Sequence, residues 1–245
     1  MYKGLYEIAS NEKIAKDVYR MVLVGDTSAI TACGQFVNVE LDGFYLRRPI
    51  SICDYDSETI TIIYKVVGKG TEYMATLGAG KKLDLLVGLG NGFDTSKSGN
   101  APLLIGGGVG VPPMFALAKK LIAEGKSVNV ILGFNTKDDV FYAEEFENVG
   151  TKVFVATADG SVGTKGFVTT VLQEEKIDYT YFYTCGPEPM LKALYNATST
   201  SGQLSFEERM GCGFGACMGC SCKTKYGNKR ICKEGPVLEK EEIIW

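Results

Sequence analysis

The sequence predicts a three-part protein of mixed class, in which an antiparallel β-barrel precedes a parallel α/β domain and a small module organised by metal. Three observations lead to this prediction. Short apolar strands without long helical patterns fill residues 1–94, and strands alternate with helices from residue 103 onward. Five of the eight cysteines then fall between residues 212 and 232, in a segment that fits neither pattern. A length of 245 residues is enough for two ordinary domains and such a module.

Composition and charge exclude several classes of function. Hydrophobic residues make up 45% and charged residues 22%, which is typical of a soluble globular protein, and a net charge of −3 argues against nucleic acid as a partner. The sequence contains no apolar run long enough to span a membrane and no signal-peptide core, so we expect a cytoplasmic protein without membrane partners. Thiols stay reduced in that compartment, which favours metal binding over disulfides for clustered cysteines.

Histidine is absent from the whole chain. The usual general base, the usual zinc ligand, His-containing triads and Rieske-type clusters are therefore all excluded. We therefore do not expect this protein to catalyse hydrolysis with its side chains. Chemistry carried by cofactors is the natural alternative.

The first part, residues 1–96, is expected to form the barrel. Its apolar runs are rich in β-branched and aromatic residues, and turn residues such as those in "LDGF" and "DYDSE" separate them. Several strands at this spacing favour a small antiparallel barrel. The expected strands are 18–25, 34–41, 48–55 and 59–68, with Cys33 and Cys53 as small core residues within strands. The polar segment 95–102, "TSKSGNAP", is typical of a linker.

The second part, residues 100–203, is expected to form a parallel sheet with crossover helices. Patterns of short buried strands alternate along it with patterns of amphipathic helices, which is typical of that architecture. The expected strands are 103–107, 127–134, 151–159 and 178–186, and the expected helices are 113–125, 166–176 and 188–198.

A glycine loop joins the first strand and first helix of this second part, in "LLIGGGVGVPPMFALAKKL". Glycines let the backbone come close to a bulky anion, and the helix that follows supplies free N–H groups and the positive end of its dipole. This order of strand, loop and helix predicts binding of a dinucleotide pyrophosphate, with a plain tight turn as the alternative. The spacing is not that of a P-loop. The candidate binding residues are Gly106, Gly107, Gly108 and Gly110.

The third part, residues 204–245, contains the cysteine pattern C-x4-C-x2-C followed by a fourth cysteine after eleven residues. This is the spacing of plant-type [2Fe–2S] proteins, and the intervening glycines let a loop wrap a cluster. Zinc is the alternative, although zinc sites usually have two C-x2-C pairs and only one is present; disulfides would leave an odd thiol over. The predicted ligands are Cys212, Cys217, Cys220 and Cys232, and Cys222 is expected to be a non-ligand, although it could replace Cys220.

Several motifs resemble those of the ferredoxin–NAD(P) reductase superfamily: "RRPISI" (47–52), "GGGVGVPPM" (106–114) and "CGPEPM" (185–190). The resemblance implies a six-stranded flavin barrel in front of a dinucleotide domain. It implies that Arg48 meets the flavin pyrophosphate and that Ser51 lies near the isoalloxazine, with Pro49 and Ile50 completing the motif. An ordinary strand start is the alternative reading of these residues.

The resemblance also implies further contacts. Cys185 is expected near the nicotinamide, with Gly186 and Pro187 allowing close backbone approach, although a strand that ends in a Gly-Pro turn needs no ligand. Many relatives have Arg in place of Lys65, so a bidentate phosphate contact would become a point charge here. The remaining implied flavin contacts are Ile63, Tyr64 and Lys65, together with Gly70 and Thr71 at a turn over the flavin phosphates.

The choice between NAD and NADP depends on charge. Recognition of a 2′-phosphate would require a basic cluster after the second strand of the dinucleotide domain. The segment "GFNTKDDVFYAEEF" (133–146) has a single Lys among acidic residues, which favours NAD.

Over essentially its whole length the chain is similar to the electron-transfer subunits of type B, NAD-linked dihydroorotate dehydrogenases, and "ERMGCGFGACMGCSCKT" (208–224) is the most specific part. The resemblance implies bound FAD, a [2Fe–2S] cluster and NAD. It implies a partner catalytic subunit that contains FMN and oxidises dihydroorotate in pyrimidine synthesis. Electrons would pass through the cluster and FAD to NAD⁺, in a heterotetramer of two subunits of each kind. Phe214 and Met218 beside the cluster would suit the subunit contact, with burial inside the loop as the alternative.

Two other functions stay open from the sequence. One is an electron-transfer subunit of another NAD(P)H-linked complex, which acts with a ferredoxin-, sulfide- or hydrogen-linked partner. The other is a zinc-stapled nucleotide-binding module without redox chemistry.

Overall fold

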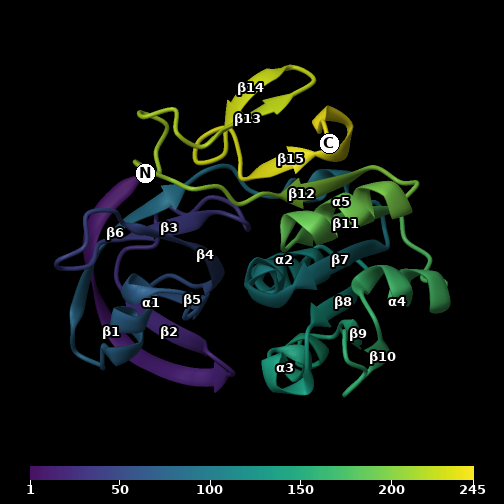
Figure 1. Ribbon diagram of the computed structural model, residues 1–245, viewed down its shortest axis with the longest axis horizontal. Helices are drawn as coiled ribbons and strands as arrows, with labels where there is room; N and C mark the ends of the chain where they lie inside the picture. The colour runs from purple at the N-terminus through teal and green to yellow at the C-terminus, as the bar shows by residue number, and fades with distance from the viewer.

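The structure, a computed structural model, describes residues 1–245 as a barrel, a sheet with helices on both faces, and a small hairpin above them (Figure 1). The barrel is closed and antiparallel, in the order β1-β2-β5-β4-β3-β6. The expected six-stranded barrel is therefore confirmed. Its strands are β1 (Tyr2–Ala15), β2 (Val18–Val24), β3 (Phe36–Val39), β4 (Arg48–Tyr55), β5 (Thr59–Lys65) and β6 (Lys82–Leu89).

Two placements in the barrel region differ from the sequence prediction. Cys53 lies buried in β4 as expected, but Cys33 lies in a buried turn before β3 and not in a strand. Gly70 and Thr71 lie in the first turn of a helix, α1 (Lys69–Thr76), where a simple turn was expected. The Thr71 hydroxyl accepts hydrogen bonds from the N–H groups of Val67 and Gly68 and closes that first turn.

The connection between barrel and sheet is folded, although its composition predicts a linker. Asp94 caps a short 3₁₀ turn, η1 (Thr95–Lys97), by accepting from the Ser96 N–H at 3.0 Å. Thr95 and Ser98 are buried, and the hydroxyl of Tyr183 donates to the Asp94 carbonyl at 2.9 Å. The barrel is thus attached to the sheet by side-chain hydrogen bonds as well as by the chain.

Seven strands form the sheet, in the order β10-β9-β8-β7-β11-β12-β15. All pair in parallel except β15, which runs antiparallel to β12 at the edge. The strands are β7 (Pro102–Gly107), β8 (Asn129–Phe134), β9 (Lys152–Thr157), β10 (Thr164–Lys165), β11 (Tyr181–Cys185), β12 (Gly202–Ser205) and β15 (Val237–Glu239). The alternation predicted from residue 103 is confirmed.

Helices cover both faces of the sheet. Side chains that alternate along β7 pack against different helices on the two faces. Leu104 packs with α2 (Pro112–Ala123) and α3 (Ala143–Asn148) in the core that reaches the barrel. Leu103 and Ile105 pack on the opposite face with α4 (Val168–Glu174) and α5 (Glu188–Ala197). Helix α2 therefore lies between the sheet and barrel strand β4 (Figure 1).

The cysteine-rich segment leaves the sheet after β12 and returns to it as β15. Between them it forms a hairpin of β13 (Ser221–Thr224) and β14 (Gly227–Arg230), and a 3₁₀ turn, η4 (Lys240–Glu242), follows β15. Asn91 at the end of the barrel donates to the carbonyls of Glu234 and Val237 and accepts from the Val237 N–H. The segment is thus bonded to both larger parts. No helix in the structure combines the length and apolarity needed to cross a bilayer.

Candidate functional site

The glycine loop lies at the carboxyl ends of β7 and β11. Residues Gly108–Gly110 form a 3₁₀ turn, η2, between β7 and α2. A Cβ atom on Gly110 would lie 2.2 Å from the carbonyl oxygen of Cys185, so only glycine allows this approach. At Gly108, by contrast, a Cβ would meet nothing within 4 Å. The loop therefore packs against the Cys-Gly-Pro turn through Gly110 and faces open space at Gly108.

A first cavity of about 430 Å³ opens over this loop. Its walls come from the ends of β7 and β8, the start of α4 and the start of α5, and they are mainly apolar. Lys65, at the end of barrel strand β5, is the only cationic side chain in the lining. Four predicted site residues line this cavity: Lys65, Gly107, Gly108 and Pro187. Other lining residues are Phe134, Asn135, Asp139 and Phe167.

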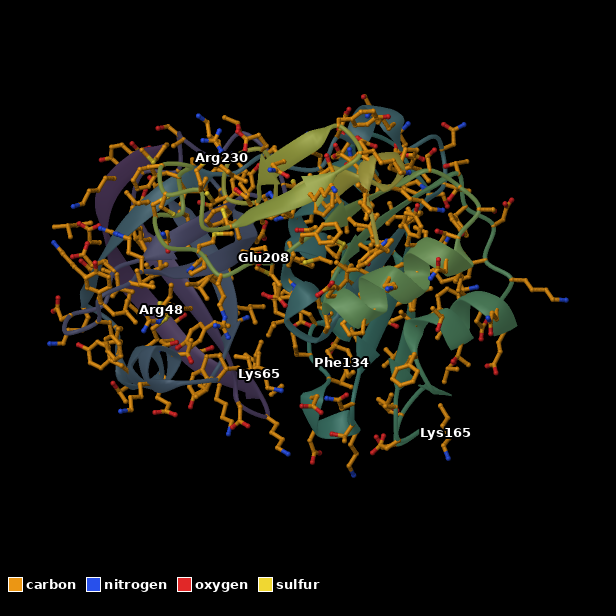
Figure 2. All side chains as sticks on the ribbon, turned by 45° about the horizontal axis from the view of Figure 1, so that its top comes forward. Arg48, Lys65, Phe134, Lys165, Glu208 and Arg230 are labelled. Atoms are coloured by element: carbon orange, nitrogen blue, oxygen red, sulfur yellow. The ribbon has the colours of Figure 1, made fainter.

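A second cavity of about 330 Å³ adjoins the first and lies between the barrel, the glycine loop and the segment after β12. Lys65, Gly107, Gly108 and Pro187 line both cavities. Figure 2 shows Lys65 and Phe134 facing the space between the two halves of the molecule, with Glu208 above it. Nine predicted site residues line the second cavity: Pro49, Ser51, Lys65, Gly107, Gly108, Gly110, Cys185, Gly186 and Pro187.

Arg48 lies at the first turn of α1, on the side of the barrel away from the sheet (Figure 2). A Cβ on Gly70 would be 2.2 Å from the Arg48 Nε, so the guanidinium lies directly over the backbone of that turn. The guanidinium also lies over the Phe44 ring, 5.0 Å from its centroid, and donates to the Leu46 carbonyl. A cation and a helix N-terminus thus meet at one place, an arrangement suited to a phosphate.

Besides Arg48, Gly70 and Thr71, four predicted contacts line neither cavity. Ile63 and Tyr64 are buried in the protein core, and the Tyr64 hydroxyl donates to Asn11 at 2.9 Å, inside the barrel. Gly106 is buried against Val111, and Ile50 is half-buried in β4. Roles of these four residues in cofactor binding stay predictions.

Cys185 is a neutral thiol at the boundary between sheet and barrel. Burial raises its pKa to about 12, while the Ser205 hydroxyl hydrogen-bonds to it and lowers the pKa. Glu207 nearby also has a raised pKa, because of burial and then of the charge on Glu208. Cys185 therefore offers a thiol hydrogen and not a thiolate to a ligand in the second cavity.

The sequence analysis missed several lining residues. Asn135 and Glu207 are the clearest, because Asn135 is the first residue after β8 and Glu207 is the second after β12, at the edge where such sheets place ligands. A polar residue at that position was a usable signal. Phe36 and Phe167 had no such signal, because an aromatic residue at the start of a strand or helix is equally typical of the hydrophobic core.

The acidic segment after β8 lies beside the first cavity. Asp139 accepts from the Thr136 N–H and hydroxyl, and its other oxygen lies 3.8 Å from the Lys65 ammonium. The only cation of the cavity is thus already faced by a carboxylate. This arrangement does not suit a dinucleotide that carries an extra phosphate.

The four predicted cysteine ligands lie together in two pairs. The Cys217 N–H donates to the Cys212 Sγ at 3.4 Å, and the two side chains interact. The Cys232 N–H donates to the Cys220 Sγ at 3.4 Å, and these side chains also interact. No three Cys, Asp or Glu side chains converge as one metal ion would require. Cys222 is outside both pairs and lines a separate cavity with Trp245.

Backbone N–H groups point at the first pair. Burial alone would raise the pKa of Cys212, but hydrogen bonds from the backbone of Cys217, Phe214 and Ala216 outweigh it and lower the pKa to about 6. The Ala216 N–H is 3.2 Å from the Cys212 Sγ. The loop is therefore built to hold negative charge on sulfur.

The residues at these sites fit the iron–sulfur cluster, flavin and dinucleotide that the sequence predicts. Two pairs of thiols with N–H donors aimed at the sulfurs suit two irons, each held by two cysteines. All eight cysteines are free thiols, so none is used in a disulfide. The glycine loop, a cation at a helix N-terminus and two joined cavities suit a dinucleotide beside a flavin.

Comparison with known protein families agrees with this geometry. Residues 207–244 match the family described as the iron–sulfur cluster binding domain of dihydroorotate dehydrogenase B. Residues 104–196 match the oxidoreductase NAD-binding domain.

Similar proteins cover the whole chain. The chain is 46% identical to a dihydroorotate dehydrogenase B (NAD(+)) electron transfer subunit of Fusobacterium nucleatum, over 96% of each chain. It is 42% identical to the subunit of that name from Bacillus pumilus, over 99% of this chain and 98% of the relative.

Solved structures show the same fold. A chain of an NADH-dependent reduced ferredoxin-NADP oxidoreductase superposes with a TM-score of 0.89 at 28% identity, over 99% of this chain and 90% of that one. A ferredoxin NADP⁺ reductase of Neisseria gonorrhoeae shares the fold with a TM-score of 0.69 at 16% identity, over 80% and 90%.

Proposed function

Because the chain belongs to the family of dihydroorotate dehydrogenase B electron transfer subunits, we propose that it carries electrons from an FMN-containing, dihydroorotate-oxidising partner to NAD⁺. It holds one [2Fe–2S] cluster and one FAD for this task, as part of pyrimidine biosynthesis. When bound, these groups convert between one-electron and two-electron transfer, since the cluster exchanges single electrons and the flavin exchanges a hydride with the nicotinamide.

One structural observation carries the proposal. The segment Glu207–Met210 that closes the second cavity runs directly into Cys212, the first residue of the cysteine pairs. The Asn38 side chain of barrel strand β3 donates to the Cys212 carbonyl at 3.4 Å, so the loop is fastened to the barrel rim. The cluster site and the cavity for the flavin thus share one short piece of chain.

We assign three parts to three tasks: residues 1–96 to FAD, 100–203 to NAD and 204–245 to the cluster. Arg48, with the backbone of Gly70 and Thr71, would hold the flavin pyrophosphate, and Pro49, Ile50, Ser51, Ile63, Tyr64 and Lys65 would border the flavin. Gly106, Gly107, Gly108 and Gly110 would form the turn that carries the NAD pyrophosphate, with Gly108 as the position open to it. Cys185, Gly186 and Pro187 would border the nicotinamide, and Cys212, Cys217, Cys220 and Cys232 would ligate iron.

The partner would dock over the cluster. Phe214 is 44% exposed and Met218 is 55% exposed, and both belong to the loop that carries the cysteines. Exposed apolar side chains at a redox loop are suited to a protein interface that shortens the electron path. We propose that the assembly is a heterotetramer with two subunits of each kind.

A different electron donor is the second candidate, because the full-length structural neighbour at 28% identity acts with ferredoxin according to its description. The identity of 46% to the named dihydroorotate dehydrogenase subunit supports the first candidate more strongly. Co-purification with the chain under anaerobic conditions separates the two. A zinc-stapled module is favoured least, since the thiols are paired for two metal atoms.

The proposal is tested by the visible spectrum of the anaerobically purified chain and by assays of FAD, iron and acid-labile sulfide. We expect one FAD, two irons and two sulfides per chain. Zinc without flavin would overturn the proposal.

A further inference from the structure

Arg230, at the end of β14, connects the two segments that carry the cysteine pairs. Its Nη1 donates to the carbonyl of Gly215 at 2.6 Å, within the loop between Cys212 and Cys217. Its backbone belongs to the other segment, since Arg230 is two residues before Cys232 and its carbonyl accepts from the Lys233 and Glu234 N–H groups, both at 2.9 Å. One side chain therefore bridges two stretches that are 15 residues apart.

The peptide group that Arg230 holds is directed at a sulfur. The Gly215 carbonyl shares that peptide group with the Ala216 N–H, which donates to the Cys212 Sγ at 3.2 Å. Gly215 has a φ of +91°, and a Cβ there would be 2.6 Å from the side chain of Lys233, so glycine is required. Arg230 thus fixes a peptide group whose N–H donates to a predicted ligand.

Glu234 fixes the guanidinium in turn. Its carboxylate accepts from the Arg230 backbone N–H at 2.8 Å, from Nε at 2.9 Å, and from Nη2. The guanidinium side chain is 23% exposed, and its charge is close enough to attract Cys232 and Cys220. Figure 2 shows Arg230 on the C-terminal segment above the barrel. The hydrogen bond to Gly215 and the ion pair with Glu234 thus hold the guanidinium against the loop that carries Cys212 and Cys217.

We propose that Arg230 is a positioning residue for the cluster, which locks the two ligand-bearing segments together and raises the reduction potential of the bound cluster. The inference rests on the proposed cluster ligands. A cluster gains one negative charge when it takes up an electron, so a fixed cation beside its thiolates stabilises the reduced form. Glu234 opposes this effect, because its negative charge is held close to that cation.

The test is an EPR-monitored redox titration of the full chain loaded with FAD and cluster, with the variants R230Q, R230K and E234Q. We expect the midpoint potential to fall in R230Q and to rise in E234Q. R230K retains the charge but not the planar fork to Gly215, so its potential stays near that of the unaltered chain. Both Arg230 variants are expected to release iron to a chelator about 10-fold faster, as is usual when a residue that supports a metal ligand is removed.

Lys229→Gln is the matched control, because it removes the same charge from a neighbouring ion pair, with Glu242, at a position that pairs in the hairpin with Cys222 and not with a predicted ligand. It should leave the potential and the iron release unchanged. The inference is overturned if R230Q retains full iron at an unshifted potential, or if R230Q and E234Q shift in the same direction. Failure of the proposed function would look different, since the unaltered chain would then contain no iron or sulfide.

Discussion

Cys217 is exposed while Cys220 and Cys232 are buried, so the cysteine pairs combine one accessible thiol with a sheltered pair. Replacement of Cys217 by Ser should remove the cluster and the electron transfer with the partner subunit. NADH-dependent reduction of a dye, which requires only FAD, should be largely retained. Iron content, the visible spectrum and the two activities measure these effects.

Cys222→Ser is the control, because Cys222 is outside the two pairs and lines another cavity. It should retain two irons and full coupling. Loss of the cluster in this variant with retention in Cys217→Ser would contradict the ligand assignment.

Gly110, a predicted pyrophosphate residue, lines the second cavity and packs against the carbonyl of Cys185. A methyl group there would meet the Cys185 carbonyl at 2.2 Å, so Gly110→Ala should push the glycine loop away from the Cys-Gly-Pro turn. We expect a rise of at least about 10-fold in the KM for NADH, because misplacement by 1 Å at a site costs that much or more. Steady-state kinetics with a dye acceptor measures it, and an unchanged KM would show that the two turns need not touch.

At the residue scale, sequence reasoning identified groups that belong to short motifs and missed groups that are assembled by folding. Pro49, Ser51, Gly108 and Cys185 line the same cavity as the motifs imply. Glu207 lines it too, but it is part of no recognised spacing. Its place depends on the parallel pairing of β11 and β12, a long-range contact that no local pattern contains.

Among the elements, α1 and Arg48 form the most specific local arrangement. Arg48→Ala removes the cation that lies over the first turn of α1, and we expect FAD content to fall several-fold because the helix N-terminus alone holds a pyrophosphate weakly. The ratio of flavin to protein after gel filtration measures this loss.

Arg47→Ala is the matched control. Arg47 donates to the Asn38 carbonyl at 3.2 Å, to the Asp84 carbonyl at 3.1 Å and to the Asp84 carboxylate at 2.7 Å, and its side chain makes no hydrogen bond to the first turn of α1. It should retain its flavin. Equal retention in the Arg48 variant would remove the Arg-Pro-x-Ser motif from the assignment of the flavin site.

Most elements with a clear apolar period were predictable, although β6 (Lys82–Leu89), with its apolar run, was not among the expected strands. Strand β4 was expected at 48–55 and is observed at Arg48–Tyr55. The 14-residue β1 was missed, because its sequence "YKGLYEIASNEKIA" mixes charged and small residues and its outer half is exposed. It is held as a strand by pairing with β2 and β6, which is a tertiary effect.

At the scale of the whole molecule, Asn91 joins the end of the barrel to the C-terminal segment, because its side chain makes three hydrogen bonds to residues after Cys232. Asn91→Ala leaves buried backbone groups unpaired, and we expect a loss of about 2 kcal/mol in the free energy of unfolding. This corresponds to a fall in Tm of about 4–8 °C. Thermal unfolding of the cofactor-loaded chain measures it.

Asn100→Ala is the control, because Asn100 is exposed and its side chain makes no hydrogen bond to the rest of the protein. Its Tm should change by less than about 2 °C. An equal effect of the two substitutions would mean that Asn91 does not fasten the C-terminal segment.

The return of the chain to the sheet as β15 has a consequence for biosynthesis. All six barrel strands and six of the seven sheet strands precede the cysteine loop, and β15 follows Cys232. During translation the barrel and most of the sheet can therefore fold while Cys232, the last predicted ligand, is still inside the ribosome. Edge strand β15 can pair with β12 only after Cys232 has emerged. The order of synthesis thus places the completion of the sheet after the emergence of the last predicted iron ligand.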